Sequence, residues 1–159
     1  MELNEFLKRQ GSNMERQWLP NFSELIDRLS IHQLKEIFIP EHKDKYSKEM
    51  AEIENDIDII IKEKDIKLTA KLIRTIIVMS QMNEHIWYNE SKARSGKDQD
   101  VNLLKLTHGI NGIRSRAGNY LLEQIGDCEK RDWKTDCLAA EFKDWETSLI
   151  PDDNSDSKT

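Results

Sequence analysis

Four side chains suited to binding a ligand share one face of a segment in the middle of this chain. Their spacing of four, three and four residues places them on a single helical stripe that contains Asn83, Trp87, Glu90 and Arg94. An arginine can hold an anion, and a tryptophan ring can form a wall against which a ligand stacks. The stripe predicts a polar site for a small anionic or sugar ligand, and it specifies no reaction.

Two other segments carry polar residues at positions that helical periodicity turns partly inward. One precedes Pro40 and the other follows Asp100. If the three segments pack together, the candidate ligand-binding residues are Glu24, Asp27, Lys35, Asn83, Trp87, Glu90, Arg94, Asn111 and Arg114. The alternative is a charge-paired network that fixes how the helices pack and binds no ligand, because such networks resemble binding sites. The sequence leaves both interpretations open.

Four long amphipathic helices are expected to position these residues. We expect the first to run from about Asn21 or Ser23 to Ile39, with Ser23 a good N-cap and Pro40 ending it, and to be well buried as far as Phe38. The others are expected over 43–63, from about 65 to a C-cap at Gly96, and over 100–125. The widest apolar face lies in 67–95, so this helix should be central, with 43–63 as its antiparallel neighbour.

The predicted fold is therefore all-α, an antiparallel four-helix bundle with short helical extensions at the N- and C-termini. Residues 1–20 are expected to form an N-terminal arm, 21–126 the bundle, 127–150 a connector with an amphipathic C-terminal helix, and 151–159 a disordered acidic tail. Inside the last helix of the bundle, Gly109, Gly112 and Gly118 indicate close helix approach or room for a ligand.

The expected C-terminal helix has an apolar stripe of its own. Its members are four, three and four residues apart: Leu138, Phe142, Trp145 and Leu149. Such a stripe can dock onto the protein's own bundle. It can also anchor a partner protein or a second subunit, for which large aromatic side chains are well suited.

A weak internal repeat aligns residues 36–43 with residues 85–92. In each copy an aromatic residue follows isoleucine, Phe38 in the first and Trp87 in the second. A glutamate and then a lysine follow at the same distances in both copies. Duplication of a helical hairpin would explain the pattern and would yield a four-helix bundle.

Composition excludes several classes of function. The chain has 159 residues, 37% of them hydrophobic and 34% charged, which suits one domain. A net charge of −6 argues against nucleic-acid binding by phosphate neutralisation. No apolar run is long enough to span a membrane, and no signal peptide opens the chain. Cys128 and Cys137 are too few for a disulfide framework, and we expect a cytoplasmic protein with reduced thiols.

An enzymatic alternative depends on an acidic stripe in residues 43–63. Glu49, Glu52, Asp56 and Glu63 could hold magnesium in a metal-dependent nucleotide hydrolase, but no second set of ligands is evident, so a solvated outer face is the simpler interpretation. The four histidines form no metal-binding pair, and no phosphate-binding loop is present. The sequence therefore predicts no catalytic residue, no metal and no cofactor.

Two motifs resemble the signatures of an uncharacterised helical domain family of bacteria and phages, whose function is not established. Residues 23–31, SELIDRLSI, with Lys35, resemble GELIDKLTIxxxK; residues 83–94, with Asn83, Trp87, Glu90 and Arg94, resemble NxxLWxxEDxxR. The chain departs from this pattern at Ser23, Ser91 and Pro40. The resemblance covers about residues 22–125, and it implies the helical fold and the polar face.

These observations favour a non-enzymatic binding or scaffolding protein. It would act through the polar bundle face or through the C-terminal aromatic helix, as a homo-oligomer or with a protein partner. The first alternative is a nucleotide or sugar-nucleotide binding protein with its pocket inside the bundle. The second is the metal-dependent hydrolase.

Overall fold

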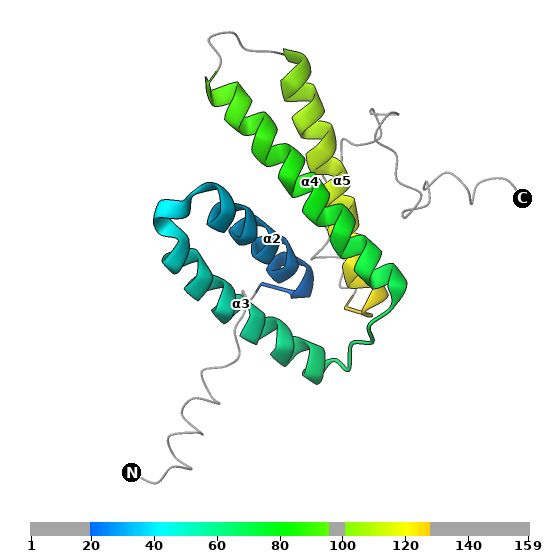
Figure 1. The fold of residues 1–159 in the computed structure, drawn as a ribbon. Coiled ribbons are helices and arrows are strands. Elements are labelled where there is room, and N and C mark those ends of the chain that lie inside the picture. The colour runs from blue at the N-terminus through cyan, green and yellow to red at the C-terminus, as the bar shows by residue number, and fades with distance from the viewer. Residues whose placement is uncertain (1–19, 96–100, 128–159) are drawn as a thin grey trace, which may run out of the picture.

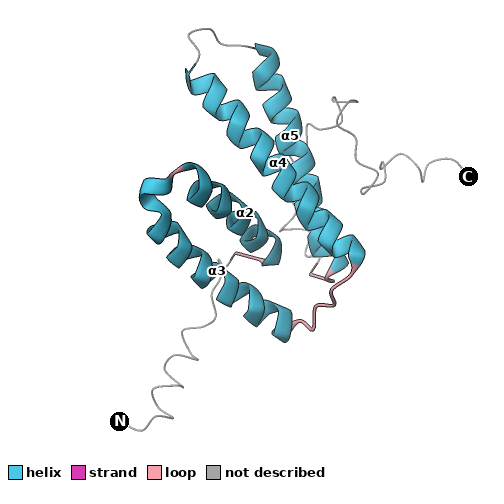
Figure 2. Ribbon diagram, viewed as in Figure 1, coloured by secondary structure: helices cyan, strands magenta, loops and turns pink. Residues whose placement is uncertain are grey.

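The computed structural model describes residues 20–95 and 101–127, and within these ranges every regular element is a helix (Figures 1 and 2). The elements in order are α2 (Phe22–Phe38), a 3₁₀ turn η1 (Pro40–His42), α3 (Lys43–Glu63), α4 (Ala70–Ser95) and α5 (Val101–Gln124). The predicted all-α architecture of four long helices is confirmed. The predicted N-terminal arm, the Gly96 C-cap, the C-terminal helix and the acidic tail lie outside the described residues.

The four helices form two antiparallel hairpins, α2 with α3 and α4 with α5 (Figure 1). Helix α2 lies between α3 and the second hairpin and contacts all three other helices. It is therefore the central helix, and the prediction that residues 67–95 take this place is wrong. The broad apolar face of that segment is shared between α2 on one side and α5 on the other.

The predicted packing of residues 43–63 against 67–95 is also wrong, because α3 packs chiefly against α2 and makes few contacts with α4. The link between them explains the difference. Asp65 has a positive φ of 48°, and residues 66–69 are not helical, so α4 begins at Ala70, five residues later than expected. Such a link spans more distance than a helical turn of the same length, so α4 need not lie against α3.

Helix α2 begins with a capping box centred on Asn21, not on the expected Ser23. The Asn21 Oδ1 atom accepts a hydrogen bond from the Glu24 backbone N–H at 2.9 Å, and the Glu24 carboxylate accepts one from the Asn21 N–H at 3.1 Å. Ser23 instead occupies the first turn and is buried. The box satisfies two amide groups that the helix itself leaves without partners.

Replacing Asn21 with alanine should lower the free energy of unfolding by about 1 kcal/mol, because the Glu24 amide loses its acceptor. Urea denaturation followed by circular dichroism measures the change. Asn21→Asp keeps an oxygen acceptor in the same place and should stay within a few tenths of a kcal/mol of the original protein. Equal losses in both variants would contradict the capping role.

The hydrophobic core lies where α2 meets α4 and α5. Its least exposed side chains include Phe22, Met79, Ile110 and Leu121, each at most 2% exposed. The apolar residues spaced three and four apart on α3 and α5 are buried or half-buried, as amphipathic helices require. They are Tyr46, Met50, Ile53, Ile57 and Ile60 on α3 and Leu103, Leu106, Ile110, Ile113, Ala117 and Tyr120 on α5. Gly118 provides close approach between α2 and α5, since a Cβ atom there would lie 2.9 Å from Ser23 Oγ. No helix in the described ranges is both long enough and apolar enough to cross a bilayer.

Candidate functional site

Three of the predicted polar residues meet between α2, α4 and α5, and the Asn83 amide joins them. This side chain is only 3% exposed. Its Nδ2 atom donates to Asp27 Oδ1 at 2.8 Å and to Ser30 Oγ at 2.6 Å, and its Oδ1 atom accepts from Arg114 Nη1 at 3.0 Å. One amide therefore bonds to two residues of α2 and one of α5, which fixes the three helices relative to one another.

The charged members of this cluster compensate each other. Arg114 Nε lies 3.9 Å from Asp27 Oδ1, and the two side chains are 22% and 17% exposed. That Nε atom is buried and has no hydrogen-bond partner among the described residues, so the carboxylate supplies its charge compensation from a slightly longer distance. We call Asp27, Ser30, Asn83 and Arg114 the polar network. Ser30 was missed as a site residue, although it lies one helical turn after Asp27.

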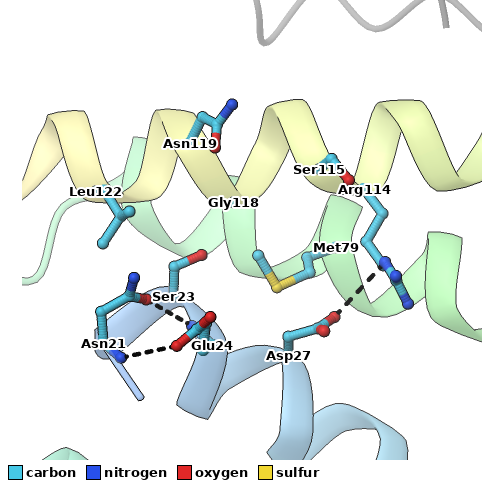
Figure 3. A pocket seen from close by; sticks show the side chains of 10 residues that line it. All are labelled: Asn21, Ser23, Glu24, Asp27, Met79, Arg114, Ser115, Gly118, Asn119 and Leu122. Carbon is cyan, nitrogen blue, oxygen red and sulfur yellow. Dashed lines mark hydrogen bonds and ion pairs between the residues drawn. The ribbon is translucent and has the colours of Figure 1, made fainter. Parts of the chain in front are cut away.

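A small recess lies beside the polar network (Figure 3). In Figure 3, Asp27 faces Arg114, and the Asn21–Glu24 pair lies nearby. The residues that line the recess are Asn21, Ser23, Glu24, Asp27, Met79, Arg114, Ser115, Gly118, Asn119 and Leu122. Its volume of about 10 Å³ corresponds to a single water molecule, whereas pockets for small organic ligands have about 300–1,000 Å³. This recess therefore suits a water-sized group.

Of the nine candidate ligand-binding residues, the structure brings together Asp27, Asn83 and Arg114, with Glu24 at the edge of the recess. Lys35 is elsewhere, with its Nζ atom 5.7 Å from the centre of the Tyr46 ring. Asn111 and Glu90 are exposed on α5 and α4. Arg94 belongs to α4, but its side chain lies outside the described residues. The predicted stripe on α4 thus does not form one site.

Trp87 lies outside the polar network because it packs against the last turn of α2. Its ring stacks on Phe38, with centroids 6.2 Å apart and planes at 26°. Tyr88 meets the same Phe38 ring edge-on, with centroids 5.6 Å apart. Phe38 and Trp87 are the residues that the weak internal repeat aligns, so the two copies touch at equivalent positions.

These aromatic rings form an exposed surface. Phe38 is 43% exposed, Tyr88 44% and the adjacent Ile37 60%, while Trp87 is half-buried. We call Ile37, Phe38, Trp87 and Tyr88 the aromatic patch. The expectation that the first helix is buried as far as Phe38 is wrong, because its last turn extends beyond the core. Large apolar side chains gathered on a surface in this way mark interaction sites.

The acidic stripe of α3 lies on the outside of the molecule. Glu52, Asp56 and Glu63 are exposed. Glu49 is 2.9 Å from His32 Nε2 and also pairs with Lys45 at 3.9 Å. Within residues 20–95 and 101–127, no group of three or more histidine, cysteine, aspartate or glutamate side chains is placed to hold a metal ion. The arrangement is that of a solvated helix face with local pairs.

Comparisons with models of protein families, with curated proteins and with solved structures gave no match. The resemblance to a helical family of bacteria and phages therefore remains a prediction.

Proposed function

We propose that this protein is a non-enzymatic binding module that holds a protein partner through the aromatic patch. The observation that carries the proposal is the exposure of two aromatic rings from two helices, Phe38 and Tyr88. They pack on each other, and Phe38 also stacks on the half-buried Trp87, at the end of the α2–α4 interface. Aromatic side chains dominate the binding energy of protein interfaces because each buries a large area at a small cost in side-chain entropy.

The internal contacts of the patch suit it to binding. The Phe38 ring packs against both Trp87 and Tyr88, and these contacts restrict its side chain before a partner arrives, so little side-chain freedom is lost on binding. A partner with apolar side chains would bury the exposed parts of Phe38, Tyr88 and Ile37. Self-association through the same surface is one form that this function can take.

The small-ligand alternative has less support. The polar groups that were expected to contact a ligand bond to each other, and the recess beside them has the volume of one water molecule. A nucleotide or sugar nucleotide would therefore have to separate α2 from α5. The hydrolase alternative has less support still, because the acidic stripe faces solvent.

Removing the Phe38 ring should weaken partner binding at least tenfold and leave the fold intact. A tenfold loss corresponds to about 1.4 kcal/mol, which a central aromatic side chain commonly exceeds. The partner is first recovered by affinity capture with the full chain, identified and purified, and its dissociation constant is then measured by calorimetry. Sedimentation velocity tests the case in which the partner is a second copy.

The matched control for that experiment is Ile59→Ala. Ile59 is 44% exposed, much like Phe38, but it belongs to α3. Its replacement should change the dissociation constant less than twofold. The proposal fails if Phe38→Ala with Tyr88→Ala binds the partner as tightly as the original chain does. It also fails if the chain is monomeric and captures no partner.

A further inference from the structure

A second exposed apolar surface lies on the N-terminal part of α4 and the residue just before it. Leu68 is 76% exposed, Ile73 44% and Ile77 51%. Ile73 and Ile77 are one helical turn apart and share a side of α4, while Leu72 and Met79 on the other side are buried in the core. We call Leu68, Ile73 and Ile77 the α4 outer face. It is separate from the aromatic patch, so the role of this face does not depend on the proposed function.

The α4 outer face has a charge opposite to that of the chain as a whole. Lys67, Lys71 and Arg74 accompany it, and no acidic residue occurs between Asp65 and Glu84. All three basic residues are exposed. Lys67 contacts Asp65 at 2.7 Å, but the two side chains are 75% and 82% exposed, so this pair contributes little and can exchange. Although the chain has a net charge of −6, residues 66–83 carry only basic charges, and these accompany exposed apolar side chains.

Residues 138–149 have the complementary chemistry. Their apolar stripe of Leu138, Phe142, Trp145 and Leu149 suits an apolar helix face. The polar positions within and just before this segment include four acidic residues, Asp136, Glu141, Asp144 and Glu146, against the single Lys143. An acidic amphipathic helix and a basic apolar surface attract each other through both charge and burial.

The chain leaves the described fold at the same end of α4 as this surface, on the other side of the helix. At the end of α5, Gln124 Nε2 donates to Thr75 Oγ1 at 2.8 Å, and the Lys71 ammonium lies 5.5 Å from the Tyr120 ring centre. The last turns of α5 therefore lie beside the first turns of α4 (Figure 1). The eleven residue-to-residue steps from Asp127 to Leu138 can span about 36 Å, more than enough to pass around a helix of about 10 Å diameter.

We infer that residues 138–149 bind the α4 outer face of the same chain as an amphipathic helix. The apolar stripe covers Ile73 and Ile77, and the acidic side chains approach Lys67, Lys71 and Arg74. The short connection favours docking within one molecule, because it holds the segment at a local concentration of about millimolar. The occupant of this surface is thus the chain's own C-terminal region.

Zero-length carbodiimide crosslinking of the full-length monomer tests this inference, because the reagent joins a lysine only to a carboxylate in direct contact. We expect intrachain crosslinks from Lys67 or Lys71 to Glu141, Asp144 or Glu146, identified by peptide mass spectrometry. Ile77→Asp and, separately, Trp145→Ala should each reduce their yield at least fivefold. Ile59→Asp on α3, at a similarly exposed position, should leave the yield unchanged.

Thermal unfolding provides a second readout. Ile77→Asp and Trp145→Ala should each lower the melting temperature by several degrees, and the double variant should lose no more than the larger single loss, because both remove one contact. Additive losses would overturn the inference. So would crosslinks of equal yield to the α3 lysines, or crosslinks found only between two chains, which would make a second copy the occupant. A monomer without any of these crosslinks would overturn it as well.

Discussion

Replacing Asn83 with leucine should lower the free energy of unfolding by about 3–4 kcal/mol. The change removes the donor for Asp27 and Ser30 and the acceptor for Arg114, and it leaves partly buried charges with fewer partners. Denaturant titration followed by circular dichroism measures the loss. Asn111→Leu, at an exposed position on α5, is the matched control and should change the free energy by less than about 0.5 kcal/mol.

A triple variant tests whether the charges of the polar network contribute to the stability of the fold. The triple variant Asp27→Leu, Asn83→Leu, Arg114→Met removes both charges of the network as well as the amide. Well-packed apolar residues can replace a buried ion pair at little cost in stability. The triple variant should therefore be more stable than Asn83→Leu alone. If the triple variant is less stable than Asn83→Leu, the charges of Asp27 and Arg114 make a net stabilising contribution, and the expectation is wrong.

Phe22→Ala should destabilise the fold by about 4 kcal/mol, whereas the same change at Phe38 should cost less than about 1 kcal/mol. Both residues belong to α2, one at each end. Phe22 is 2% exposed and lies in the core, whereas Phe38 is 43% exposed and packs against the rings of Trp87 and Tyr88 at the surface. Thermal and urea unfolding of the two variants measure this difference.

The Phe22 and Phe38 pair also tests the central position of α2. Replacing a phenylalanine on a peripheral helix with alanine would lower the free energy of unfolding by less, because such a helix could shift to fill the cavity that the ring leaves. If Phe22→Ala is too unstable to purify, Phe22→Leu should fold with a loss of about 1 kcal/mol. Equal effects at Phe22 and Phe38 would contradict the placement of α2 between α3 and the second hairpin.

Helix boundaries could be predicted where local signals agree. The bounds of α3 match the prediction, because its apolar residues keep four-three spacing and Pro40 lies just before it. The start of α2 also matches the prediction, but its N-cap was assigned to Ser23, although Asn21 followed three residues later by Glu24 is itself a capping-box pattern. Ser23 was an equally good local candidate. Only the packing of its side chain against α5, near Gly118, shows why it belongs to the first turn.

The candidate site could be predicted only in part, because periodicity determines a side chain's direction but not what lies opposite it. Asn83 and Arg114 meet because these positions of α4 and α5 lie opposite each other in the antiparallel hairpin. Trp87 lies one turn further along the same stripe, but there the opposite element is the last turn of α2, so it meets Phe38 instead. Which helix lies opposite each turn depends on the tertiary arrangement, and this information is not local in sequence.

The nonhelical link over residues 64–69 has a consequence for how this architecture can change. It joins two hairpins whose mutual contact is made chiefly by α2. Two of its residues contact the rest of the molecule: Lys64 pairs with Asp127 at 3.2 Å, and Ile66 packs against the core, whereas Lys67 and Leu68 are exposed. Doubling the length of such a link costs only about 0.6 kcal/mol of closure entropy. We therefore expect insertions between Lys67 and Leu68 to cost little stability, and a longer link would let the two hairpins pair between two copies of the chain.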